Sequence, residues 1–99
     1  MAQITIVQKG DPTGYQKLTV SNTAVGLTIP INSNRALIVV ETASIRWRDD
    51  GTSPTSTDGI QIFQNQSLEL DGGKCLSQFK AIKTGDTDAT LHINYYYVS

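Results

Sequence analysis

The sequence is poor in the residues that build most catalytic centres and covalent cross-links. Its 99 residues include one cysteine, one histidine and one tryptophan. The single cysteine, Cys75, excludes an intrachain disulfide and a metal site made of paired thiolates. We interpret Cys75 as a small buried hydrophobe. The fold must therefore rest on packing and hydrogen bonding.

Charge of one sign and long apolar runs are also scarce. Eight lysines and arginines against nine aspartates and glutamates leave a formal net charge of −1. The basic residues are scattered, which argues against the concentrated basic surface that binds nucleic-acid phosphates. No apolar run approaches the roughly 20 residues of a membrane span, and residues 1–6 lack the features of a signal peptide. We therefore expect no nucleic-acid or membrane partner, and synthesis in the cytoplasm.

The chain is rich instead in the residues of strands and turns. Segments of Val, Ile, Thr and Tyr alternate with clusters of Gly, Asp, Asn, Ser and Pro, which predicts strands joined by turns. The expected strands cover residues 4–8, 15–20, 25–30, 36–40, 45–48, 59–63, 67–70, 79–83 and 89–97. Residues 10–14 read as a loop. Residues 75–78 read either as a helical turn or as part of the following strand, and we favour the strand.

Strands of this length bury one face by closing or by stacking two sheets, so a sandwich, a jelly roll or a small barrel is expected. We predict an all-β fold with about eight short strands: a single-domain antiparallel β-sandwich, jelly-roll-like, over residues 1–99. Residues 1–14 are a candidate partner-binding arm. The apolar segment 36–40 is expected to be a central strand covered on both faces.

Period-two alternation predicts which side chains face the core. In residues 45–48, the apolar side chains point inward and the two arginines point to the opposite face. In residues 89–97, the inward face ends in two tyrosines and leaves Tyr96 outward. The residues predicted to face the core are Ile45, Trp47, Leu91, Ile93, Tyr95 and Tyr97.

The residues that carry chemistry do not form a recognisable catalytic set. His92 lies opposite the predicted core face, and no nucleophile motif accompanies it, so we favour a surface imidazole over a general base. Asp49 with Asp50, and Asp86 with Asp88, are explained by turns that bind their own backbone. We therefore predict no catalytic residue, no metal ion and no cofactor, and a protein that is not an enzyme.

The middle of the chain resembles small, mostly uncharacterised proteins encoded among bacteriophage structural genes. An apolar strand in residues 35–44 leads into the block Ile45-Arg46-Trp47-Arg48-Asp49-Asp50-Gly51, with Pro54-Thr55 shortly after it. Four later segments complete the pattern: Gly59-Ile60, Ser67 to Leu70, Phe79 to Ile82 and Leu91 to Tyr97. The resemblance covers about two thirds of the chain, and residues before Tyr15 match only loosely. It implies a virion component, such as a head decoration or cement protein or a tail accessory protein.

Three expectations about function follow from this resemblance and from the residues. Arg46 and Arg48 are expected to pair with Asp49, Asp50 or Asp58 and so to hold the loop after them. The expected partners are a phage major capsid protein or tail proteins, with homo-oligomers as a further option, and the expected location is the virion. Candidate partner contacts are Ile4, Ile6 and Tyr96, because an N-terminal strand can add to a neighbour's sheet. The alternative is a surface module that binds host carbohydrate through Tyr96 or loop aromatics.

Overall fold

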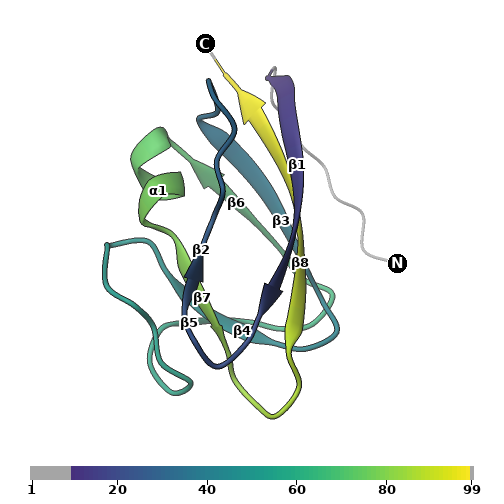
Figure 1. Ribbon diagram of the computed structural model, residues 1–99, viewed down its shortest axis with the longest axis vertical. Coiled ribbons are helices and arrows are strands. Elements are labelled where there is room, and N and C mark those ends of the chain that lie inside the picture. The colour runs from purple at the N-terminus through teal and green to yellow at the C-terminus, as the bar shows by residue number, and fades with distance from the viewer. Residues whose placement is uncertain (1–9, 99) are drawn as a thin grey trace.

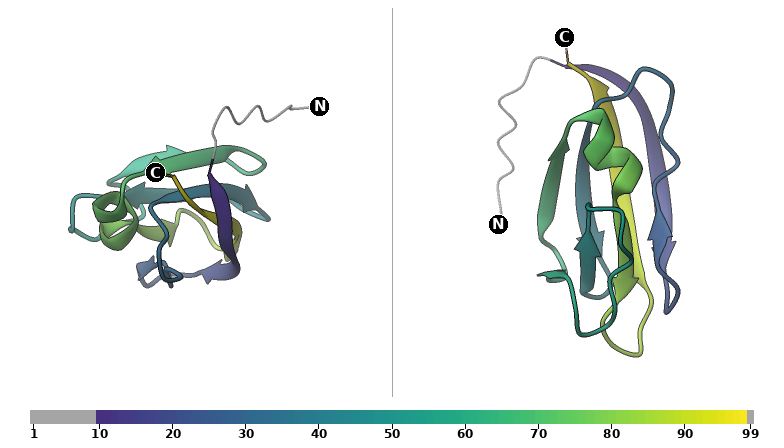
Figure 2. Two further views of the ribbon diagram at one scale, coloured as in Figure 1. Left: turned by 90° about the horizontal axis from the view of Figure 1, so that it is seen from above. Right: turned by 90° about the vertical axis from the view of Figure 1, so that its left-hand side faces the viewer.

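Two four-stranded antiparallel sheets pack face to face in the computed structural model, which describes residues 10–98 (Figure 1). The first sheet contains, in spatial order, β1 (Asp11–Val20), β8 (Ala89–Tyr97), β3 (Arg35–Glu41) and β6 (Ser67–Asp71). The second contains β2 (Val25–Gly26), β7 (Lys80–Lys83), β4 (Ile45–Arg48) and β5 (Ile60–Ile62). A six-residue helix, α1 (Gly73–Gln78), lies beside the two layers (Figure 2). The predicted all-β sandwich is confirmed.

The strand pairings are nested. Strand β1 pairs with β8, β2 with β7, β3 with β6 and β4 with β5, all antiparallel. Two further pairings, β3 with β8 and β4 with β7, join these hairpins into the two sheets. The eight strands therefore follow the path of one long hairpin that is folded over into two layers. This order supports the jelly-roll-like interpretation.

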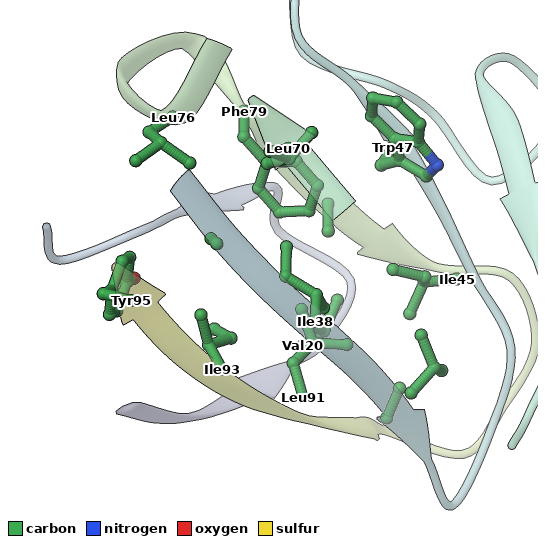
Figure 3. Close-up of a cluster of buried hydrophobic side chains, with 14 residues drawn as sticks. Val20, Ile38, Ile45, Trp47, Leu70, Leu76, Phe79, Leu91, Ile93 and Tyr95 are labelled. Atoms are coloured by element: carbon green, nitrogen blue, oxygen red, sulfur yellow. The ribbon is translucent and has the colours of Figure 1, made fainter. Parts of the chain in front are cut away.

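The core lies between the two sheets and is filled from both of them (Figure 3). Its buried residues are Val20, Ala36, Ile38, Val40, Ile45, Trp47, Leu70, Leu76, Phe79, Ala81, Ala89, Leu91, Ile93 and Tyr95. Five of the six residues predicted to face the core are among them. The Tyr95 hydroxyl donates a hydrogen bond to Gln16 Oε1 at 2.6 Å, and burial raises the pKa of Tyr95 to about 12.

The prediction for Tyr97 is wrong, because its side chain is 44% exposed. Strand β8 has nine residues, whereas its counterparts in the second sheet have at most four. The last residue of β8 therefore extends beyond the core. The expectation that the strand at 36–40 is covered on both faces is also wrong: Leu37 and Val39 are only partly buried on the outer face of β3.

Three predicted segments differ in the structure. Residues 11–14, expected in a loop, begin β1, and a register shift between Pro12 and Gly14 accommodates the proline in an edge strand. Residues 75–78 are helical, because the three-residue spacing of Leu76 and Phe79 lets a helical turn bury both side chains. The strand expected at 25–30 shortens to Val25–Gly26.

The predicted strand at residues 4–8 and most of the predicted arm lie outside the described residues. Residues 11–14 of that arm belong to β1. Within residues 10–98, no helix combines the length and the apolar character needed to cross a membrane.

Candidate functional site

The loop between β4 and β5 is organised by Arg48. Its Nε atom lies 3.1 Å from Oδ1 of Asp50, its Nη2 atom binds Oδ2, and its Nη1 atom is 3.7 Å from Oδ2 of Asp58. Asp50 also accepts a hydrogen bond from the backbone N–H of Thr52 at 3.2 Å. These hydrogen bonds, first of all the one from Arg48, hold the pKa of Asp50 below its usual value, and the same contact raises the pKa of Arg48.

Arg46 holds the loop in a different way from the one predicted. Its Nη1 atom donates to the carbonyl oxygen of Gly59 at 2.8 Å, and its Nε atom donates to that of Ser56 at 3.2 Å. Arg46 binds these backbone carbonyl oxygens because the loop between β4 and β5 passes over the same face of β4. The expected pairing of Arg46 with an aspartate is therefore wrong. Asp49 forms no ion pair within the described residues.

Replacing Arg46 with alanine is expected to destabilise the fold more than replacing Arg48. The first change leaves two loop carbonyls without their donor and is expected to lower the free energy of unfolding by about 1–2 kcal/mol. The second removes an exposed ion pair that water screens, so its effect is expected to be smaller. Urea unfolding of the two variants measures the difference. Equal losses would contradict the distinct roles of the two arginines.

A chain of three hydrogen-bonded side chains lies on the outer face of the first sheet. The hydroxyl of Tyr15 on β1 is 2.6 Å from Nδ1 of His92 on β8, and Nε2 of His92 is 2.9 Å from Oε1 of Glu41 at the end of β3. The rings of Tyr15 and His92 also stack, with centroids 6.2 Å apart. When the phenol donates to Nδ1, the other nitrogen carries the proton and donates to Glu41. These hydrogen bonds therefore fix the orientation of the Tyr15 ring, and Tyr15 is 61% exposed.

The order phenol, imidazole, carboxylate matches the logic by which a base activates a hydroxyl. The hollow beside it, however, measures about 80 Å³ and is lined mainly by Tyr15, Leu37, Val39 and His92. Small-molecule sites usually span roughly 300–1,000 Å³. The arrangement therefore presents a fixed tyrosine on a sheet face and offers little space for a substrate.

A second surface lies where β1 begins and β8 ends, with the turn at residues 30–34 beside them, at the top of Figure 1. We call it the terminal surface and define it by five residues: Asp11, Thr13, Ile31, Asn32 and Tyr97. Ile31 is 86% exposed, and the other four line a hollow of about 400 Å³. Single exposed aliphatic side chains are common on protein surfaces, and a partner that covered Ile31 would remove its apolar area from water.

Hydrogen bonds hold the terminal surface in place. Asn34 ties the turn to the end of the chain, donating from Nδ2 to the Val98 carbonyl at 2.7 Å and accepting from the Val98 N–H at 2.8 Å. Thr13 and Ser33 join β1 to the same turn through their hydroxyls at 2.7 Å. The surface is therefore organised before any partner binds.

The remaining predicted residues occupy ordinary structural positions. Asp88 accepts from Lys83 Nζ at 3.0 Å, in the turn before β8. Cys75 is partly buried, not fully buried as interpreted from the sequence. Tyr96 is partly buried beside Pro12 and Arg35 in the sheet register. Ile4 and Ile6 lie outside the described residues. Within residues 10–98, no group of three metal-ligating side chains is close enough to hold an ion.

Sequence reasoning missed Tyr15, Glu41 and Ile31 as candidate functional residues. Tyr15 and His92 are 77 residues apart in the chain, so only the β1–β8 register brings them together. Ile31 follows Pro30, where the strand predicted at 25–30 ends, and the sequence carries no signal that its side chain is exposed.

No family model, curated protein or solved structure matches this chain.

Proposed function

We propose that the protein is a non-enzymatic structural protein of a bacteriophage particle, made in the cytoplasm of the bacterial host. In this proposal it binds capsid proteins as a decoration or cement subunit. The nested strand order supports it, because jelly-roll sandwiches recur in viral capsid proteins. One fold hosts many functions, so the surface residues rather than the fold itself indicate this role.

The terminal surface is the observation that carries the proposal. It combines an aliphatic side chain that is 86% exposed, Ile31, with a fixed turn and a shallow hollow beside Tyr97. Covering such a side chain with a protein partner is favourable by roughly 25 cal/mol per Å² of apolar area. A surface that is organised in advance loses little conformational entropy on binding. These properties suit a surface that docks against another protein.

Strand β1 begins at the terminal surface, and residues 1–10 precede it in the sequence. Residues 2–8 contain no charged side chain and include Ile4, Ile6 and Val7, a composition suited to strand addition on a neighbouring sheet. The described buried core runs from Val20 to Tyr95. We therefore expect a chain without residues 2–8 to fold.

Purified phage particles test the proposal directly. We expect mass spectrometry to detect the chain in particles that have heads. We expect no signal from the chain in particles whose heads have been removed. Deleting residues 2–8, or replacing Ile31 with lysine, is expected to abolish incorporation while the circular dichroism spectrum stays that of the wild type. Ser67→Lys, which adds the same charge on exposed strand β6, is the control and is expected to incorporate normally. Absence of the wild-type chain from particles would refute the proposal.

The alternative is a surface module that binds host carbohydrate, and Tyr15 is the observation that favours it. Sugar-binding sites stack pyranose rings on fixed, exposed aromatic side chains that have polar groups beside them. Tyr15 has this character, since His92 and Glu41 orient its ring. A glycan array distinguishes the two functions: binding that is lost in Tyr15→Ala supports the carbohydrate module, and no binding by the wild type excludes it.

A further inference from the structure

Among residues 10–98 the two sheets have four edge strands, and β5, a strand of three residues, is the one least protected by charge, proline or irregular register. An edge strand exposes unpaired backbone N–H and C=O groups, and proteins usually block it with charges, proline, irregular register or short length. Strand β1 carries Pro12, a register shift and Lys17. Strand β2 has two residues. Strand β6 carries Glu69, which is paired with Arg35 at 3.1 Å. Residues 59–68, which include β5, contain neither a charged residue nor a proline.

The β5 edge also exposes apolar side chains. Ile60 and Phe63 are 57% and 54% exposed. Ile60 pairs with Trp47 across the β4–β5 ladder, so it points to the same face as the core but remains uncovered at the edge of the sheet. Ile62 and Leu68 pack against the core beside it and are only partly buried. Next to β5, the Phe63 N–H binds Gln66 Oε1 at 2.9 Å and the Gly59 carbonyl accepts from Arg46 at 2.8 Å. The edge thus combines the backbone groups of Ile60–Ile62 that do not face β4 with exposed apolar side chains.

We propose that two copies of this chain pair through β5, antiparallel and about a two-fold axis, so that their second sheets join into one eight-stranded sheet. A surface that meets its own copy must not place like charges together. The uncharged segment 59–68 satisfies this condition. Each glutamine side chain in this segment both donates and accepts hydrogen bonds, so it can bind a glutamine side chain of the other copy.

A pairing centred on the middle residue, Gln61, brings apolar side chains of the two copies together. Residue 60 of one copy then faces residue 62 of the other, which brings isoleucine against isoleucine. Phe63 of one copy then lies opposite Gly59 of the other. The charged loop at residues 48–58 of one copy lies beside the amide-rich turn at 64–66 of the other. The arginines and aspartates therefore remain at the rim, where water solvates them.

Sedimentation and light scattering of the full-length protein test this pairing. The wild type is expected to be a dimer, and Ile60→Lys is expected to raise the dimer dissociation constant at least about 100-fold, because it places a charge among the apolar side chains of the β5 edge. Ile31→Lys makes the same replacement at a more exposed position outside this edge and is expected to leave the dimer intact. A monomeric wild type, a dimeric Ile60→Lys or an equal loss in Ile31→Lys would overturn the proposal.

Cysteine cross-linking tests the register independently of any loss of folding. In a Cys75→Ser background, Gln61→Cys is expected to form a disulfide-linked dimer under oxidation, since paired residues across antiparallel strands are close enough for this bond. Ser67→Cys in the same background is the control and is expected to stay monomeric on denaturing gels. A cross-link at residue 67 but none at residue 61 would contradict the pairing.

This dimer goes beyond the proposed function and does not depend on it. Ile31→Lys is expected to lose particle incorporation and keep the dimer, whereas the wild type's absence from particles would leave the dimer result untouched. The two proposals therefore fail by different observations.

Discussion

Replacing Phe79 with alanine is expected to lower the free energy of unfolding by about 3–5 kcal/mol, as measured by urea denaturation. The Phe79 side chain is 1% exposed, and its ring stacks on Trp47 with centroids 5.8 Å apart. It lies between α1 and β7, so it joins the helix to the second sheet. Truncation leaves a cavity where these elements meet, and the rigid strands around it can close it only in part.

A loss of this size is a large part of the total stability of a small domain, which is about 5–15 kcal/mol. The matched control is Phe63→Ala, which removes the same side chain from a position that is 54% exposed. Its effect on the stability of the monomer is expected to stay below about 1 kcal/mol, because little apolar area leaves the core. Similar losses in both variants would mean that Phe79 does not pack as described.

Phe79 also shows where sequence reasoning fails. Six helical residues are too few to establish a 3.6-residue period, so residues 75–78 were read with the strand that follows. The only local signal for the helix is the spacing of Leu76 and Phe79, which puts both side chains on one side of a helical turn. Tertiary burial, rather than local propensity, decides the conformation of this segment.

The inward faces of β4 and β8 were predictable because alternation is a local property. Ile45 and Trp47, and then Leu91, Ile93 and Tyr95, follow period two and are all buried. The limit of this reasoning is the end of a strand: alternation continues to Tyr97, whereas the opposing sheet does not. How far a strand is covered depends on the lengths of its neighbours, and the period does not contain that information.

The candidate surfaces were harder to predict than the core, because they depend on the register between distant strands. The Tyr15–His92–Glu41 chain joins three strands, and each residue alone reads as an ordinary exposed side chain. Charge complementarity is visible in a sequence, and it predicts that Arg46 pairs with aspartates. The path of the β4–β5 loop, which brings the Gly59 carbonyl to the Arg46 guanidinium, is not visible in a sequence.

That path makes Gly59 the second position with a large expected effect, and Gly59→Ala is expected to cost about 2–4 kcal/mol of stability. Its φ is +135°, a conformation that side chains disfavour. A Cβ here would lie 3.0 Å from Cβ of Pro54, 3.2 Å from the carbonyl oxygen of Trp47 and 3.3 Å from Cβ of Arg46. The Trp47 oxygen belongs to the β4 backbone and cannot move without disturbing the sheet, so the loop must shift instead.

A shifted loop would carry the Gly59 carbonyl away from Arg46, and this makes the prediction specific. In Arg46→Ala the hydrogen bond is already absent, so the two substitutions together are expected to cost less than the sum of their separate effects. Gly85→Ala is the control, because no atom lies within 4 Å of a Cβ at that position; its effect is expected to stay within about 0.5 kcal/mol. Strict additivity, or a Gly59→Ala variant as stable as Gly85→Ala, would show that the close approach of this loop to β4 does not exist.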